Sequence, residues 1–170
     1  GVFTNGVINH FVDTAGGLVE FKGVNAHDSI ALAWLAEYGF KTGCISGRNS
    51  AGMHERLKML KATYIVQGRL DKKTALQEIL DQARVNTSEL LYVGDDIPDI
   101  PVIKLAGIGV ATANARPEVK AAADWVTEAR GGEGAMREVA ELLLKVQGHW
   151  PNILKKFEAG SPEIARKSVQ

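Results

Sequence analysis

The chain has 170 residues, of which 45% are hydrophobic and 24% charged, and this composition suits one globular domain with a sizeable core. Lys plus Arg equals Asp plus Glu at 20 each, so the net charge provides no overall field that would attract nucleic acid or an anionic membrane. The sequence contains no membrane-spanning apolar run and no secretory signal, and its single cysteine, Cys44, excludes an intrachain disulfide framework. The cytoplasm is therefore the expected compartment.

The first half of the chain predicts a hairpin followed by alternating helices and strands. Residues 7–12 and 18–22 are rich in β-formers and are separated by a turn-forming stretch, which predicts a β-hairpin over about 7–22. An isolated hairpin is marginally stable in water, so we expect it to pack against another surface, such as a second subunit. Helices are predicted at 28–38, 51–60 and 72–83, and strands at 40–45 and 64–67.

The second half continues the alternation and ends in a polar tail. It predicts strands near 90–93, 108–111 and 125–126, and helices near 98–105, 117–122 and 133–147. Strands that alternate with helices of this length indicate βαβ units and a largely parallel sheet. We expect one α/β domain over 1–148, and a tail over 149–170 that is either a loosely docked helix or disordered.

An acidic cluster follows the strand predicted at 90–93. Asp95 and Asp96 come directly after the glycine that ends this strand, and Asp99 follows three residues later. In a parallel sheet, ligands bind outside the carboxyl ends of the strands, and closely spaced carboxylates suit a hard cation such as Mg²⁺. The alternative is a solvated acidic turn, in which Asp96 or Asp99 only accepts hydrogen bonds from backbone N–H groups. This stretch alone leaves both interpretations open.

Two more candidate groups lie at successive strand ends. Ser46, Gly47 and Arg48 follow the strand at 40–45, where a hydroxyl and free N–H groups can bind an anion, although a simple serine turn explains the pattern equally well. Lys72 begins a helix, where its charge opposes the helix dipole. This placement makes sense if the ammonium reaches a bound phosphate, and the neighbouring Lys73 is the alternative candidate for that role. A hydroxyl, a lysine and carboxylates match the needs of phosphoryl transfer, but these residues include no identified nucleophile.

Together these segments resemble the haloacid dehalogenase superfamily of phosphatases. More narrowly, they resemble its small, cap-less sugar-acid phosphatases, typified by the 3-deoxy-D-manno-octulosonate 8-phosphate phosphatases. The resemblance runs from Gly1 to about Gln147. It rests on Ser46-Gly47-Arg48, on Lys72 in Gln67-Gly68-Arg69-Leu70-Asp71-Lys72, on Gly94-Asp95-Asp96-Ile97-Pro98-Asp99, and on the C-terminal signature Gly131-Gly132-Glu133-Gly134-Ala135-Met136-Arg137-Glu138.

The resemblance implies a Rossmann-like, three-layer α/β sandwich without a large cap domain. It also implies Mg²⁺ as cofactor, a small phosphorylated sugar acid as substrate, and a homotetramer formed through the hairpin. Asp95 would be a direct Mg²⁺ ligand and a catalytic residue, while Asp96 and Asp99 would support the metal shell and its loop. The catalytic residues Ser46 and Lys72 would hold the phosphate. The remaining substrate contacts would come from Gly47, from Arg48 and from Thr4, which lies just after the first motif of the family.

One departure from the family pattern is serious. The first strand of the family and its two aspartates, the nucleophile and the general acid/base, would precede Gly1 and are not among the 170 residues. We favour a longer chain that carries them, with a truncated protein or a natural relative without catalysis as alternatives. The leading hypothesis is a Mg²⁺-dependent phosphatase acting on 3-deoxy-D-manno-octulosonate 8-phosphate or a nonulosonate 9-phosphate. The alternatives are a non-catalytic oligomeric or regulatory protein and, less well supported, a phosphate-binding receiver-type module.

Overall fold

A computed structural model describes residues 1–160. Its parallel strands form two sheets: β3 (Gly43–Ile45) pairs with β4 (Tyr64–Val66), and β6 (Ile108–Ala111) pairs with β5 (Leu91–Gly94) and β7 (Trp125–Val126). Within residues 1–160, no backbone pairing joins the two sheets. The strands therefore run in parallel, as the sequence predicts, but they do not form one continuous sheet.

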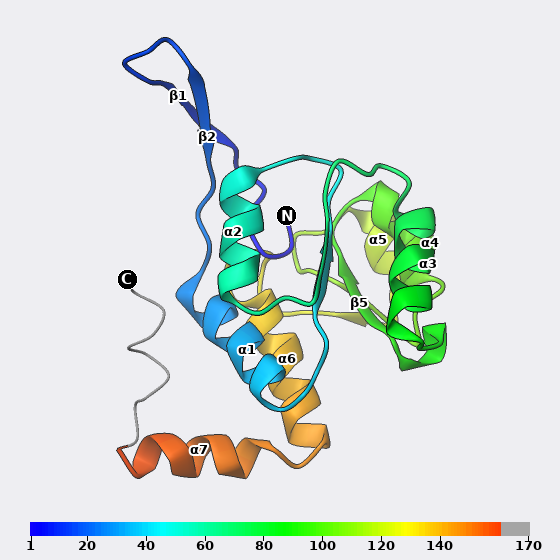
Figure 1. Ribbon diagram of the computed structural model, residues 1–170. Helices are drawn as coiled ribbons and strands as arrows, with labels where there is room; N and C mark the ends of the chain where they lie inside the picture. The colour runs from blue at the N-terminus through cyan, green and yellow to red at the C-terminus, as the bar shows by residue number, and fades with distance from the viewer. Residues whose placement is uncertain (161–170) are drawn as a thin grey trace.

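Helices cover both sides of the strands (Figure 1). On one side lie α1 (Ala26–Glu37), α2 (Ala51–Met59) and α6 (Ala135–Val146), and on the other lie α3 (Lys72–Ala83), α4 (Ile100–Ile103) and α5 (Pro117–Ala122). The expected three-layer α/β arrangement is confirmed. Within the described part of the chain, no helix is both long enough and apolar enough to cross a membrane.

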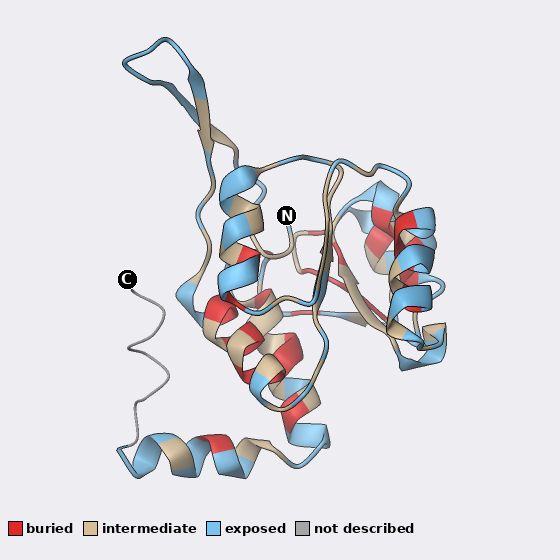
Figure 2. Ribbon diagram, viewed as in Figure 1, coloured by how far each residue is buried: buried red, intermediate tan, exposed pale blue. Residues whose placement is uncertain are grey.

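The core has one part on each side of the strands (Figure 2). The first part lies mainly between α1 and α6, and its fully buried members include Ala31, Ala140 and Leu144. The second part joins α3, α4 and α5 to the strands through apolar side chains such as Leu76, Val102, Ile103 and Val119. Burial of these faces is the main favourable term that holds the helices against the sheets.

The predicted hairpin is present as two short antiparallel strands, β1 (Asn9–Val12) and β2 (Leu18–Phe21), with Val12 opposite Leu18. The turn between them closes because Asp13 Oδ1 accepts the N–H groups of Ala15 and Gly17. The hairpin extends away from the body of the molecule (Figure 1). Its apolar side chains are consequently exposed, with 66% of Val12 and 71% of Leu18 accessible to solvent.

The structure corrects the helix predicted at 98–105. A 3₁₀ turn, η2 (Ile97–Asp99), comes first, and α4 then covers only Ile100–Ile103. The two prolines of this stretch lack backbone N–H groups, and the Asp99 side chain folds back onto the preceding backbone instead of pointing outward. Local chain geometry therefore shortens the helix that apolar spacing alone predicts.

The start of the predicted tail is a helix. α7 (Trp150–Glu158) packs its buried Ile153 into the core formed with α1 and α6, and the Trp150 ring meets that of Trp34 edge-on at 5.8 Å. Of the two alternatives for the tail, a docked helix thus holds as far as Glu158. Residues 161–170, the end of the predicted tail, lie outside the described residues.

Candidate active site

Asp99 lies at the centre of a hydrogen-bond cluster beside the carboxyl end of β5. Its Oδ1 accepts from Lys72 Nζ and from the Tyr92 hydroxyl, each at 2.6 Å. Its Oδ2 accepts from the backbone N–H groups of Asp95 and Asp96, each at 3.1 Å. Only 2% of the Asp99 side chain is exposed, so all four donors reach a carboxylate that is largely shielded from water. Such a buried charge is stable only when it is fully paired.

The surroundings of this cluster shift the pKa values of Asp99 and Tyr92. Burial by itself raises the pKa of the Asp99 carboxyl, but the charge of Lys72 and the hydrogen bonds from Lys72 and Tyr92 outweigh it, and the net pKa falls below 3.8. Burial and the neighbouring Asp99 charge raise the pKa of the Tyr92 hydroxyl. Tyr92 therefore remains a neutral donor. Sequence reasoning missed this residue, and the only local signal is that a buried tyrosine needs a partner for its hydroxyl.

The three aspartates of the acidic cluster have different surroundings. Asp99 folds over Gly94, where an added Cβ would lie 2.5 Å from the Asp99 Cβ, so this position requires glycine. Asp96 is exposed, and its Oδ1 accepts the N–H of Ile97 at 2.8 Å. Asp95 Oδ2 lies 2.6 Å from the terminal nitrogen of Gly1. The capping interpretation thus describes Asp96, whereas Asp99 is buried and also accepts from Lys72 and Tyr92, and the Asp95 carboxylate faces the nitrogen of Gly1.

Asp95 is the carboxylate here that fits a divalent cation. Among residues 1–160, no group of three or more His, Cys, Asp or Glu side chains is arranged to hold a metal ion. Asp99 already accepts four hydrogen bonds, which suits it to holding the loop rather than to direct coordination. Asp95 Oδ2 accepts a hydrogen bond from the Gly1 nitrogen, and a carboxylate oxygen of this kind suits a hard cation. Further oxygen ligands would have to join it.

Ser46 lies on a loop at the carboxyl end of β3. Its Oγ accepts the N–H of Arg48 at 3.1 Å, so the predicted serine turn is present. The hydroxyl still has its own proton to donate, which leaves the anion-binding interpretation open. The Ser46 carbonyl accepts the N–H of Arg69 at 3.0 Å, and this bond ties the loop to the segment that leads to Lys72. The loops after β3 and β4 therefore lie together.

Gln67 is a second residue that sequence reasoning missed. Its side-chain Oε1 accepts the N–H of Ser50 at 3.0 Å and its Nε2 donates to the Ser50 carbonyl at 3.2 Å, so it holds the start of α2. Nearby, a Cβ added at Gly47 would meet the Leu70 side chain at 2.7 Å. Close packing of these two loops thus favours a small residue at position 47.

The structure distinguishes Lys72 from Lys73. Lys72 has 15% of its side chain exposed and points to Asp99, whereas Lys73 is exposed on the outer side of α3. Thr4 lies on the segment at the start of the chain, where its Oγ1 accepts the N–H of Gly6 at 3.3 Å. Arg137 lies away from these groups, because its guanidinium covers the Trp34 ring at 4.2 Å and its Nε pairs with Glu141.

Arg48 pairs with the hairpin. Its Nη2 lies 3.3 Å from Glu20 Oε2, and Lys22 Nζ lies 2.9 Å from Glu20 Oε1. The nearby Lys22 ammonium, helped by Ser50 and Arg48, lowers the pKa of the Glu20 carboxyl to about 2. Sequence reasoning did not single out Glu20, since nothing local shows that β2 meets the loop after β3. The hairpin and this loop are therefore connected by charge.

We expect Glu20 to remain ionised until the pH falls to about 2. Because its pKa is lowered in the folded state, the stability that its ion pairs contribute is fully present above the ordinary pKa of 4.5 and is lost as the pH falls to the folded value. The measurement is an NMR titration of the Glu20 carboxyl carbon, with Lys22→Met expected to raise the midpoint. A midpoint at the ordinary glutamate value in the unsubstituted protein would contradict this pairing.

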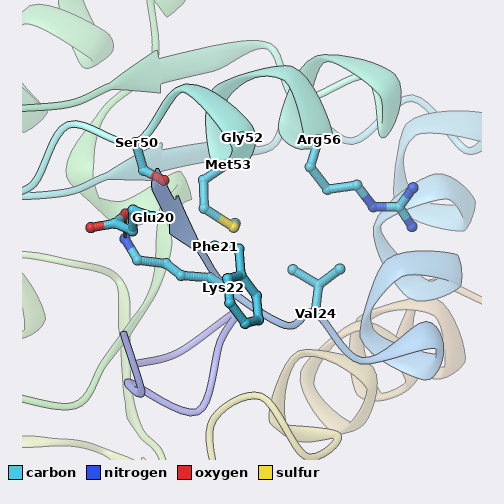
Figure 3. A pocket seen from close by; sticks show the side chains of 8 residues that line it. All are labelled: Glu20, Phe21, Lys22, Val24, Ser50, Gly52, Met53 and Arg56. Atoms are coloured by element: carbon cyan, nitrogen blue, oxygen red, sulfur yellow. Dashed lines mark ion pairs between the residues drawn. The ribbon is translucent and has the colours of Figure 1, made fainter. Parts of the chain in front are cut away.

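A pocket of about 230 Å³ lies between the base of the hairpin and the start of α2. Glu20, Lys22 and Ser50 line one end of it, Arg56 lies toward the other, and apolar side chains lie between them (Figure 3). Because Glu20 also contacts Arg48, the pocket adjoins the loop that carries Ser46. The arrangement offers room and charge for a polar organic group beside the candidate phosphate site.

Comparison with known proteins gives consistent matches. Residues 58–138 match the family model of haloacid dehalogenase-like hydrolases. The chain is 35% identical to the 3-deoxy-D-manno-octulosonate 8-phosphate phosphatase KdsC of Escherichia coli K12 over 129 residues, which is 76% of this chain and 69% of that protein.

Two solved structures share the fold. The 3-deoxy-D-manno-octulosonate 8-phosphate phosphatase of Moraxella catarrhalis, in complex with magnesium, phosphate and KDO, is 34% identical, has a TM-score of 0.86, and aligns over 92% of this chain and 88% of that chain. The cobalt-bound deoxy-D-mannose-octulosonate 8-phosphate phosphatase of Haemophilus influenzae is 32% identical, with a TM-score of 0.79 and coverage of 87% and 84%.

Proposed function

Since the chain belongs to the haloacid dehalogenase-like hydrolases, as a phosphoric monoester hydrolase of that superfamily, we propose that it releases phosphate from a sugar-acid phosphate such as 3-deoxy-D-manno-octulosonate 8-phosphate. The observation that carries this proposal is the cluster in which buried Asp99 holds Lys72 beside Asp95 at the carboxyl end of β5. The substrates of the E. coli and Moraxella relatives support the choice of sugar acid. A nonulosonate 9-phosphate is the second candidate substrate.

In this proposal the residues of the chain bind and orient the phosphoryl group. Lys72 supplies a positive charge to its oxygens, and Ser46 donates its hydroxyl proton to one of them. Asp99 keeps the Lys72 ammonium in place, and Tyr92 helps to hold that carboxylate. Arg48, with Gly47 in the same loop and Thr4 at the start of the chain, contacts the rest of the substrate, and the pocket beside Glu20 adjoins this side.

We propose that Mg²⁺ is held by Asp95, with Asp96 and Asp99 shaping the loop that presents it. When bound, a divalent cation neutralises charge on the phosphate and orients it for in-line attack. The Moraxella and Haemophilus structures, which contain magnesium and cobalt, support a divalent metal in this family.

The nucleophile is proposed to be an aspartate of a strand that precedes Gly1 in a longer chain. β3 and β5 each have only one strand partner within residues 1–160, so each has one edge without a strand beside it. Unpaired strand edges inside a sheet are unfavourable. The Gly1 nitrogen lies beside Asp95, so a parallel strand ending there would bring its last residues to the same edge as Lys72. That aspartate would form the phospho-aspartate.

The test of this function combines a measurement of the intact mass with an assay of phosphate release. The intact mass of the protein from its native source shows whether residues precede Gly1, and phosphate release is measured with each candidate sugar-acid phosphate, with and without Mg²⁺. We expect a larger mass and Mg²⁺-dependent turnover of 3-deoxy-D-manno-octulosonate 8-phosphate. A mass equal to residues 1–170 without turnover would instead favour a non-catalytic oligomeric or regulatory protein.

We further propose that the hairpin joins copies of this chain into a homotetramer. The exposed apolar pair Val12 and Leu18 lies on facing strands, and contiguous apolar surface of this kind marks interaction sites. Burial of each such side chain contributes about 1.5–3 kcal/mol.

Replacing both Val12 and Leu18 by serine is therefore expected to shift the assembly toward monomer by at least about tenfold in its dissociation constant. The matched control is Leu142→Ser on α6, where 44% of the side chain is exposed. Analytical ultracentrifugation gives the oligomeric state of each variant. A monomeric unsubstituted protein, or an unchanged assembly in the hairpin variant, would contradict the proposal.

A further inference from the structure

Asp28 caps a helix to which it does not belong. It lies in the first turn of α1 and is fully buried, with 0% exposure. Its Oδ2 accepts the N–H of Gly134 at 3.1 Å, and its Oδ1 accepts the N–H of Arg137 at 2.9 Å. Gly134 precedes α6 and has no side chain to cap it. The Asp28 carboxylate therefore takes the place of a capping side chain, and its negative charge interacts favourably with the positive end of the α6 dipole.

The loop that Asp28 holds presses on the start of the chain. The Gly132 N–H donates to the Val2 carbonyl at 2.8 Å, and the Gly131 N–H donates to Asn114 Oδ1 at 2.8 Å. A Cβ added at Gly131 would overlap the Gly1 carbonyl, and one added at Gly132 would overlap the backbone of Thr4 and Asn5. These glycines are thus required because two backbone segments pass in direct contact.

The contacted segment reaches the candidate active site. The Gly1 nitrogen lies 2.6 Å from Asp95 Oδ2, and Thr4 is three residues further along. Asn114, the second anchor of the glycine loop, follows β6, whose end pairs with Gly94. The position of residues 1–5 therefore depends on a loop that is fixed from two sides, by Asp28 of α1 and by Asn114.

We propose that Asp28 is a positioning residue for the phosphatase reaction. It fixes Gly131–Gly134, and this loop holds residues 1–5 against the carboxyl end of β5, where the reacting phosphate is proposed to bind. The expected effect on catalysis rests on the proposed function, whereas the positioning of residues 1–5 by Asp28 and the glycine loop rests on the contacts alone. Asp28 does not touch the substrate and acts only through the loop.

The test compares Asp28→Asn with a matched control in the full-length protein. In Asp28→Asn, the amide NH₂ faces a backbone N–H that has lost its acceptor. Glu138 is the control because its carboxylate also accepts two backbone N–H groups, but these are the N–H groups of Glu128 and Ala129, at 3.0 and 2.9 Å, and not those of Gly131–Gly134. Asn114→Ala removes the second anchor of the loop and serves as the alternative if Asp28→Asn does not fold.

Two readouts separate positioning from general stability. Hydrogen exchange of the amides of residues 2–6 is expected to rise about tenfold in Asp28→Asn and in Asn114→Ala, with the amides of β6 unchanged. The kcat for phosphate release is expected to fall about tenfold or more while KM stays nearly constant, because a displaced group weakens the transition state rather than binding. Glu138→Gln is expected to leave both readouts unchanged.

The outcomes distinguish this inference from the proposed function. Unchanged exchange at residues 2–6 in folded Asp28→Asn would overturn the inference, as would raised exchange with an unchanged kcat. If the unsubstituted protein releases no phosphate, the proposed function fails, and the exchange measurement alone decides whether Asp28 positions the segment.

Discussion

Lys72→Met is expected to lower kcat/KM for phosphate release by about 10²–10³-fold, the usual cost of removing one preorganised group that stabilises transition-state charge. The Lys72 ammonium is held 2.6 Å from Asp99 Oδ1 with little exposure to water, so no movement of the chain is needed to present it. Steady-state kinetics with 3-deoxy-D-manno-octulosonate 8-phosphate measure the effect. Methionine fills most of the same space, but it removes both the charge and the N–H groups that reach Asp99, so the folded fraction of the variant is measured alongside its rate.

The neighbouring lysine provides the control for this experiment. Lys73 has the same chemistry, stands one position further on the same helix, and is exposed to solvent. Lys73→Met is expected to change the transition-state free energy by no more than about 0.5 kcal/mol, as surface substitutions usually do. A normal rate in Lys72→Met together with a large loss in Lys73→Met would assign the phosphate contact to the other lysine.

Asp99→Asn is expected to lower the free energy of unfolding by about 3–5 kcal/mol, because it leaves the Lys72 charge without its buried partner. The carboxylate accepts four hydrogen bonds and is 2% exposed, so water cannot replace it. Urea unfolding of the purified protein measures the change. Asp96→Asn is the matched control, since Asp96 is exposed and its side chain accepts only backbone N–H groups of the 3₁₀ turn that follows it.

A double substitution tests the cause of this loss. In Asp99→Asn combined with Lys72→Met, the uncompensated charge is removed, and the total destabilisation is expected to be smaller than the sum of the two single effects. If the two effects simply add, the ion pair is not the reason for the instability, and packing around Asp99 would have to explain it. The double variant also remains testable if Asp99→Asn alone unfolds.

Local signals in the sequence were sufficient for most elements. The helix predicted at 72–83 and observed as α3 begins after Asp71, whose side chain accepts the Thr74 N–H. The helix at 117–122 and the strands at 108–111 and 125–126 also have the observed bounds. Caps, helix-starting prolines and apolar runs act within a few residues of each other, so a sequence displays them directly.

The sequence by itself determined the class of fold, the order of elements and the positions of Ser46, Lys72 and Asp95 at strand ends. Only the tertiary structure decided which distant groups pair. Asp99 pairs with Lys72 across 27 residues, Arg48 with Glu20 across 28, and Asp28 with the glycine loop across more than 100. The reason is physical. Helix and strand formation depends on neighbouring residues, whereas the partner of a buried charge depends on how packed elements bring distant side chains together, and local preferences do not encode that arrangement.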